Sequence, residues 1–450
     1  MNPSRIRRWS LDRRARGKVS APRSPGEPFV SRLFRRLRRV EQFGRMFFQS
    51  ARALVRPAPA GFAQSTAATP ARYQELANSL ELPDRPMPLS KFERAVPGEA
   101  TLIARMARMA AHAVIDNYCA TKLSDCFANA MRDQHAKSHG CVKAEFIVRD
   151  DLPAEFTTSL FRRGARYPAI VRFSNGLGTP QSDRKLDARG MAIKLRGVDT
   201  TTLLRTLVPD RTHADEHDFV LSSFPVFFCK DAVDYSELMD AVSAPHRTLT
   251  EWFMRIRRWS VFIVWHPRQF VMFLLTGVVS VLTIRNPLTA TYHSMSPYLF
   301  GEDKVVRYVV GPGRRRNNVA RWWTFLCWWR SDHFLRDALV KDLNPATHRP
   351  GDDLAFDFSI RIRHSASTDD AEDASRWWNR PLDRTVRLGR IEIPRQNFLT
   401  PDRQYECEHM MFNPWNCLEQ HRPLGSINRM RLAVYLASLQ VRRKLNMVAS

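Results

Sequence analysis

Several features that would assign this 450-residue chain to a common class are missing from its sequence. The seven cysteines form no CxxC pair and no zinc-ligand spacing, and a chain of this length does not need disulfides to be stable. We therefore expect reduced cysteines and a reducing compartment. The first 30 residues lack the basic, apolar and cleavage regions of a secretory signal. Together these absences predict an intracellular protein, either cytoplasmic or peripherally bound to a membrane.

Long uninterrupted apolar runs are also missing. Residues 259–284 are strongly apolar, but His266, Pro267 and Arg268 interrupt them, and the clean run at 270–284 has only 15 residues. A helix that crosses a bilayer needs about 20 apolar residues. The stretch at 259–284 therefore predicts a buried helix or one that dips into a membrane surface, not a spanning helix.

Acidic residues are scarce near the N-terminus. The formal net charge is +25, and the first 60 residues hold 16 Arg or Lys against three acidic residues. Residues 29–54 repeat apolar side chains at helical spacing among arginines, which predicts a basic amphipathic helix. Such a helix could bind an anionic membrane, belong to an organelle-targeting peptide, or pack on the folded domain. Nucleic-acid binding is not favoured, because its only support is net charge and much of that charge lies in this arm.

Composition divides the chain into two parts. We expect residues 1–72 to form a basic, partly disordered arm that ends in a linker rich in Pro and Ala. Residues 73–450 would then form one domain, with a helical pattern at 101–131 and a helical C-terminus. Between them lie the apolar runs KAEFIV, YPAIVRFS, GMAIKL, DFVLSSFPVFF, KVVRYVV, AFDFSIRI and RLGRIEI, which are typical of strands. This order predicts an α+β domain with a large antiparallel sheet or barrel.

Three residues of the C-terminal segment carry the strongest chemical signal. Arg431, Tyr435 and Arg442 lie in RMRLAVYLASLQVRR, which contains no Pro or Gly and is predicted to be helical. At about 100° per residue, their spacing places all three on one stripe of the helix. Positive charge favours the phenolate form of a nearby phenol, and tyrosine is a known protein ligand of haem iron. An ordinary basic amphipathic helix with one buried tyrosine would show the same pattern.

Two further pairs precede this helix in the sequence. Arg132 and His135 are three residues apart, which would place them on adjacent faces if the segment were helical. Arg172 and Ser174 are two residues apart in a predicted strand, so their side chains should point to the same side.

With these motifs the chain resembles the catalase family over roughly 131–235 and 395–445. The resemblance rests on the order and spacing of Arg132-x-x-His135, Val171-Arg172-Phe173-Ser174, Asp187-x-Arg189-Gly190-x-Ala192-x-Lys194, Asp218-x-Val220 through Pro225-x-Phe227-Phe228, Arg431-x-x-x-Tyr435 and Arg442. NPLTATYHSMSPYLFG, CEHMMFNPWN and HRPLGSINRMR resemble the compact catalase-related branch of bacteria and fungi, which lacks extra C-terminal domains.

The resemblance implies a catalase-type antiparallel β-barrel, surrounding helices, and a haem b buried between the barrel and the C-terminal helix. It implies that Tyr435 is the proximal iron ligand and that Arg431 neighbours it. It further implies that His135 is the distal acid and base, and that Ser174 orients its ring. The guanidinium groups implied to pair with the haem propionates are those of Arg132, Arg172 and Arg442.

One departure from the family bears on the substrate. Ser223 stands where the family has a distal asparagine that orients peroxide, and a serine hydroxyl has a shorter reach. The leading hypothesis is a haem-dependent catalase or peroxidase that acts on hydrogen peroxide or an organic hydroperoxide. The alternatives are a lipid-hydroperoxide isomerase or dehydratase similar to allene oxide synthase, and a non-enzymatic haem-binding protein associated with a membrane. The segments 29–54 and 259–284 could make peripheral membrane contact, which favours a membrane-proximal substrate and so the lipid-hydroperoxide alternative. An oligomer is possible.

Overall fold

The structure, a computed structural model, describes residues 71–82, 88–122, 130–198, 201–207, 215–243, 248–313, 331–347 and 354–449. All of them belong to the second of the two units into which the chain divides, residues 63–450. The predicted amphipathic helix at 29–54 and most of the predicted arm at 1–72 lie outside the described residues. The proposed domain boundary at residue 72 therefore stays a prediction.

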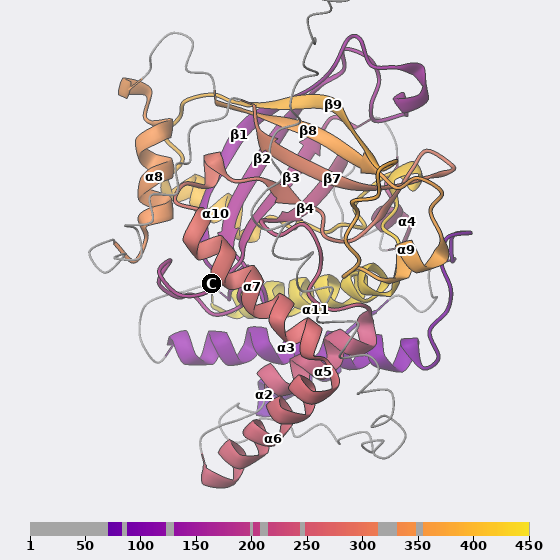
Figure 1. Cartoon of the computed structure of the whole chain (residues 1–450). Coiled ribbons are helices and arrows are strands. Elements are labelled where there is room, and N and C mark those ends of the chain that lie inside the picture. Colours follow the sequence, from indigo (N-terminus) through magenta and orange to yellow (C-terminus); the bar gives the residue numbers. More distant parts are fainter. Residues whose placement is uncertain are drawn as a thin grey trace, which may run out of the picture. The chain divides into compact units, whose positions relative to one another are not determined.

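Antiparallel strands form a closed barrel in the described part of the chain (Figure 1). The hydrogen-bonded order is β5-β4-β3-β2-β1-β9-β8-β7, and pairing of Tyr292 and His293 with Val310 and Val309 joins β5 to β7 and closes the ring. The strands are β1 Ser138–Val148, β2 Arg166–Asn175, β3 Arg189–Arg196, β4 Glu216–Ser222, β5 Tyr292–His293, β6 Tyr298–Phe300, β7 Lys304–Pro312, β8 Leu354–Ile362 and β9 Arg384–Ile393. The sixth strand, β6, pairs only with β7 and lies beside the ring. The predicted α+β class and antiparallel barrel are confirmed.

Alternation along the strands separates a core face from a site face. On β2, Val171 and Phe173 are fully buried in the main hydrophobic cluster, which also contains Phe146, Phe219 and Phe358. The ring centroids of Phe146 and Phe358 are 5.0 Å apart and those of Phe219 and Phe358 are 4.8 Å apart, so aromatic packing fills the barrel. Because successive side chains on a strand point to opposite faces, the intervening residues of β2 face outward.

Helices surround the barrel (Figure 1). The described ones are α2 Ala71–Asn78, α3 Glu99–Lys122, α4 Leu203–Leu207, α5 Ala232–Val242, α6 Leu249–Trp265, α7 Pro267–Thr283, α8 Phe334–Leu343, α9 Thr368–Glu372, α10 Pro401–His409 and α11 Ser426–Ala449. The long helices α3 and α11 lie side by side, and the small buried residues Ala107, Ala433 and Ala437 let them approach closely.

Buried ion pairs fix the start of α11. Arg429 lies 2.6 Å from Glu93, 2.6 Å from Glu99 and 3.0 Å from Glu372, so one guanidinium joins three separate segments. Planar guanidinium groups suit such multiple carboxylate contacts. This network fixes the N-terminal end of α11 relative to the segments that carry the three glutamates.

Three expectations differ from the structure. The stretch at 259–284 belongs to two helices, α6 and α7, because Pro267 begins a new helix after His266 and the axes bend by 106°. Strand β4 ends at Ser222, so the second half of DFVLSSFPVFF is not a strand. Strands β5 and β6 were not expected, because two or three residues are too few to show alternation.

The expectation that all cysteines are reduced is wrong for one pair. Cys141 on β1 and Cys407 on α10 form a disulfide, with Cα atoms 5.9 Å apart and 266 residues between them in sequence. Two cysteines so far apart in the sequence form no recognisable motif, so only the folded structure shows that they can pair. The bond ties α10 to the barrel wall.

Candidate functional site

One pocket collects most of the predicted site residues. It lies between the outward face of β2–β4 and helix α11, and it is also bordered by the segment before β1 and the segment after α10. Its lining includes the predicted residues Arg132, His135, Arg172, Ser174, Tyr435 and Arg442. Apolar side chains of Met191, Val220, Leu221, Met411, Phe412 and Leu439 complete much of the wall. Mostly apolar walls with a few convergent polar groups are typical of a ligand site.

His135 is held in place by three contacts. Its backbone N–H donates to the Gly176 carbonyl over 2.9 Å, its carbonyl accepts from Arg172 Nη2 over 2.9 Å, and its ring Nδ1 lies 3.1 Å from Ser174 Oγ. The residue has a φ of +58°, in the left-handed region that is unfavourable for a residue with a side chain. Residues 132–135 are therefore not helical, and the loop conformation turns the ring toward the pocket. Local backbone strain of this kind is concentrated at functional sites.

The electrostatic surroundings keep the His135 ring neutral. Burial, and then the nearby charge of Arg172, lower the pKa of His135 to about 4. A neutral imidazole at physiological pH can accept a proton, which is the property required of a general base.

Gly190 makes the close approach of His135 possible. In the antiparallel register Gly190 lies opposite Ser174, and Ala192 lies opposite Arg172. A Cβ atom at Gly190 would lie 2.4 Å from Nδ1 of His135 and 2.8 Å from Oγ of Ser174. Any side chain at this position would displace the His135 ring, which is why position 190 requires a glycine.

Charged residues of the DARGMAIK motif support the site without lining it. Asp187 Oδ1 accepts from the backbone N–H groups of Gly176 and Leu177, each over 3.0 Å. Arg189 donates to the side chain of Asn175. These bonds hold the turn after β2, and the Gly176 carbonyl of that turn accepts from His135.

Ser223 is the predicted catalytic residue that does not line the pocket. Its Oγ accepts from the Arg189 N–H over 3.0 Å and lies 2.8 Å from Oγ of Ser280 on α7. The hydroxyl is therefore bonded to Arg189 and Ser280, and neither of these residues lines the pocket. A distal role for Ser223 stays a prediction.

Tyr435 and Arg431 are neighbours on α11, as the spacing predicts. Arg431 Nη2 donates to the Tyr435 hydroxyl over 3.2 Å, and its guanidinium carbon is 5.4 Å from the ring centroid. Arg431 also donates to Asn428 Oδ1 over 3.1 Å, and it lies behind the tyrosine and does not line the pocket. Ser438 and Arg442 follow Tyr435 on the pocket-lining stripe.

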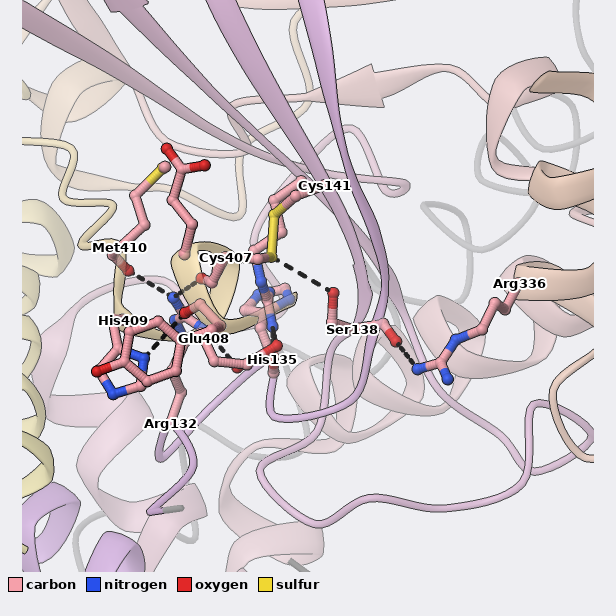
Figure 2. The surroundings of a disulfide bond; sticks show 12 residues. Arg132, His135, Ser138, Cys141, Arg336, Cys407, Glu408, His409 and Met410 are labelled. Atoms are coloured by element: carbon pink, nitrogen blue, oxygen red, sulfur yellow. Dashed lines mark hydrogen bonds and ion pairs between the residues drawn. A yellow bond between two sulfur atoms is a disulfide. The ribbon is translucent and has the colours of Figure 1, made fainter. Parts of the chain in front are cut away.

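A cluster of three arginines lies at one end of the pocket, around a glutamate that the sequence analysis missed. Arg132 Nη1 is 2.9 Å from Glu408 Oε2, and Arg172 Nη2 is 3.8 Å from Glu408 Oε1. Arg442 Nη1 donates to the Glu408 carbonyl over 2.9 Å. Burial disfavours the carboxylate charge, but the three guanidinium groups outweigh it and lower the pKa of Glu408. The glutamate follows Cys407, so its position depends on α10 (Figure 2).

This arginine cluster holds more positive charge than Glu408 neutralises. Burial, followed by the charge of Arg132, lowers the pKa of both Arg172 and Arg442 to about 9. Guanidinium groups nevertheless stay protonated near neutral pH, so both arginines remain buried cations. The Nε atoms of Arg172 and Arg442 are buried and have no hydrogen-bond partner among the described residues. These donors fit a ligand that carries carboxylate groups, as the propionates of a haem do.

Three other pocket residues were not singled out from the sequence. Gly190 had a signal, because it lies inside the quoted motif. Asp133 and Ser438 had none; they meet across the pocket edge, where Asp133 N lies 3.4 Å from Ser438 Oγ. Burial raises the pKa of Asp133, although Ser438 and Arg442 partly oppose the shift.

Comparisons with known proteins agree with this geometry. The sequence model of the family Catalase matches residues 128–278. A catalase-related peroxidase of Mycolicibacterium paratuberculosis is 25% identical over 291 residues, which cover 62% of this chain and 79% of that protein. Catalase C of Rhizobium meliloti is 33% identical over 110 residues, 24% of this chain and 13% of that protein.

A solved structure shares the fold. A fungal catalase superposes with a TM-score of 0.50 at 17% identity, and the match covers 72% of this chain and 62% of that one. The chain thus spans less than two thirds of the fungal catalase, and at this identity the match supports the fold alone. The barrel and its surrounding helices are shared with the fungal catalase, and the relatives named above are a catalase-related peroxidase and a catalase. Over residues 128–278 the chain is similar in sequence to the catalase family.

Proposed function

We propose that the protein is a haem b-dependent oxidoreductase that acts on peroxides, as a catalase or, with a reducing cosubstrate, as a peroxidase. The observation that carries this proposal is the convergence of His135 and Tyr435 on one pocket. His135 comes from the barrel side and has a lowered pKa, whereas Tyr435 comes from α11 and accepts a hydrogen bond from Arg431.

Each residue has a role that its surroundings support. Tyr435 would bind the iron through its phenolate oxygen, and Arg431 would stabilise that negative charge. Arg132, Arg172 and Arg442 would bind the propionates. When bound, the haem would supply an iron centre that accepts electrons from the peroxide or returns them to it.

His135 would move the proton that peroxide chemistry requires. Its neutral ring would take a proton from one peroxide oxygen and return it to the other, so that the O–O bond can break with water as the leaving group. Ser174 Oγ, 3.1 Å from Nδ1, would fix the tautomer and leave Nε2 for the substrate.

Absorption spectroscopy followed by an oxygen-electrode measurement tests the proposal. The purified protein should show a high-spin ferric haem spectrum and should consume hydrogen peroxide. Oxygen release would identify a catalase, and turnover that depends on a reductant would identify a peroxidase. A protein that fails to take up haem would refute the proposal.

A lipid-hydroperoxide isomerase or dehydratase is the second candidate. Ser223 directs its hydroxyl to Ser280 and not into the pocket, and the remaining walls are largely apolar. This arrangement favours a large apolar peroxide over hydrogen peroxide. Consumption of a fatty-acid hydroperoxide without oxygen release would support it. Haem binding with neither activity would favour a non-enzymatic haem protein.

A further inference from the structure

The bent helix pair α6–α7 exposes an unusual amount of apolar surface. Of the seventeen large hydrophobic side chains exposed among the described residues, eleven lie on these two helices and eight on α6 alone. Leu249, Phe253, Val264 and Trp252 are exposed by 79%, 64%, 52% and 50%. An apolar patch of this extent on a folded protein marks an interaction site.

The exposed side chains of α6 and α7 do not contribute to the packing of these helices against the domain. Each helix already has a buried stripe: Phe262 of α6 packs with Leu238 and Ala241 of α5, and α7 buries Met272, Thr276 and Ser280. The outer residues of α6 therefore face away from the domain. Figure 1 shows α6 extending away from the barrel, beyond α7.

The bend between the helices is anchored by specific contacts. His266 Nε2 lies 2.5 Å from Glu237 Oε2, and its Nδ1 lies 3.5 Å from Asp234 Oδ1, both on α5. Gln269 donates to Asp234 Oδ2 over 2.9 Å, and Pro267 begins α7. The angle of 106° thus depends on contacts to α5, and it presents α6 at a defined orientation.

The charge and length of α6 indicate which class of partner binds this surface. Arg255, Arg257 and Arg258 lie on α6, where Glu251 is the single acidic residue and is used in the N-terminal capping box. Each helix has 17 residues, and no single described helix is long and apolar enough to cross a bilayer. A helix of this length spans about 26 Å, short of the ~30 Å hydrocarbon core. Arg258 also donates to the Asp240 carbonyl, which leaves Arg255 and Arg257 to face a partner. Amphipathic helices that carry both Trp and Arg bind in the interface of anionic membranes.

We propose that α6 is the membrane-docking element of this protein, that it lies in the surface of an anionic lipid bilayer, and that α7 links it to the barrel. A second copy of the chain fits less well, because like-charged arginines of two copies would meet at the shared surface. The proposal is independent of the haem chemistry.

Vesicle co-sedimentation with the full chain tests this docking. The wild type should bind vesicles of phosphatidylcholine mixed with phosphatidylserine and should bind pure phosphatidylcholine more weakly. The double variant Trp252→Glu, Phe253→Glu should bind at least about tenfold more weakly, because two inserted rings become charged. The matched control is Leu382→Glu, which changes an equally exposed side chain outside these helices. Equal binding of the double variant and the wild type would overturn the proposal.

A local readout separates α6 from other membrane-binding segments. A photoreactive benzoylphenylalanine in place of Phe253 should cross-link to lipid, whereas the same group in place of Leu382 should not. If it cross-links instead to a second copy of the chain, and the double variant converts a dimer to a monomer, the surface is a protein interface and the membrane proposal is wrong.

A second inference comes from Glu408 and rests on the proposed haem binding. The Glu408 carboxylate faces Arg132 and Arg172, and the Glu408 backbone carbonyl accepts from Arg442, so the residue contacts all three arginines that would bind propionates. The disulfide between Cys141 and Cys407 anchors the adjacent residue to β1 (Figure 2). Arg132 also donates to the carbonyls of Cys407 and Met410, over 3.1 and 2.6 Å.

We infer that Glu408 is a positioning residue, an internal counter-ion that orders the three arginines and competes with the propionates for them. A carboxylate next to the site opposes the binding of further carboxylates through like-charge repulsion. Glu408 thereby preorganises the arginines and limits affinity for anionic ligands.

Haem titration of the apoprotein tests this inference. Glu408→Gln should bind haem about tenfold more tightly than the wild type, because one repulsive charge is removed. Haem with esterified propionates should bind both proteins equally. Unchanged or weaker haem binding by the variant would overturn the inference and leave the haem proposal standing. Failure of both proteins to bind haem would overturn both.

Discussion

Arg431 donates a hydrogen bond to the Tyr435 hydroxyl across one turn of α11, over 3.2 Å. The bond places a permanent positive charge directly behind the one tyrosine oxygen that faces the pocket. Asn428, one turn earlier, accepts from the same guanidinium and fixes its direction. The helix thus holds a guanidinium donor against the Tyr435 oxygen before any ligand arrives.

Replacing Tyr435 with Phe should abolish or convert the high-spin ferric haem spectrum, because the proposed iron ligand loses its only oxygen. Tyr167→Phe is the control: the Tyr167 hydroxyl donates to the Leu160 carbonyl over 2.8 Å, and this tyrosine does not line the pocket. The control should keep the wild-type spectrum. Normal haem loading with an unchanged spectrum in Tyr435→Phe would disprove the ligand assignment.

His135→Ala should keep haem but lose about 10²- to 10⁴-fold in peroxide turnover, the usual contribution of a general acid–base group. Ser174→Ala should cost less, because the His135 backbone keeps its hydrogen bonds to the Gly176 carbonyl and to the Arg172 side chain. Steady-state peroxide consumption measures both. Wild-type turnover in His135→Ala would remove His135 from the mechanism.

Much of the barrel could be predicted because its strands carry their own pattern. The alternation of Val171 and Phe173 with Arg172 and Ser174 predicts both the strand and its two faces. The short strand β5 could not be found in this way, since its two residues pair only after β4 and β7 are in place. Closure of the barrel is therefore a property of the assembled fold.

The site was predictable where a motif was local and not where it was tertiary. Arg431 and Tyr435 are four residues apart on one helix, so the helical period alone brings them together. Glu408 reaches Arg132 across 276 residues, and no spacing rule connects them. The contact between Ser223 and Ser280 likewise depends on the position of α7. That helix begins at Pro267, whereas the sequence predicted one helix through this region.

The unfolding free energy should fall as the pH drops below about 6.5, the ordinary pKa of histidine. Burial lowers the pKa of His421 to about 3 and of His217 well below its ordinary value. Between these values the unfolded chain binds protons that the folded chain does not, so acid favours unfolding. Urea unfolding of the apoprotein at about pH 7, 6 and 5 should show this decrease.

A variant at His421 assigns part of this pH dependence. His421→Gln should unfold more easily at neutral pH, since the ring bonds to Thr158 and packs on Phe161, but its stability should depend less on pH below about 6.5. Tyr167→Phe, which removes another buried hydrogen bond but no histidine, should leave the slope unchanged. A slope in His421→Gln identical to that of the wild type would show that His421 does not contribute.

The disulfide between Cys141 and Cys407 should contribute roughly 2–5 kcal/mol to the stability of the domain, because it closes a very long loop of the unfolded chain. Cys141→Ser should lower the unfolding free energy by that amount in denaturant titrations without reductant. Reductant should destabilise the wild type to the same extent and leave both Cys141→Ser and the double variant with Cys407→Ser unaffected. Equal sensitivity of wild type and variants to reductant would show that the two cysteines are not bonded in solution. Loss of the disulfide should also release α10 from β1. If the position of Glu408 depends on this disulfide, the haem affinity of Cys141→Ser should differ from that of the wild type.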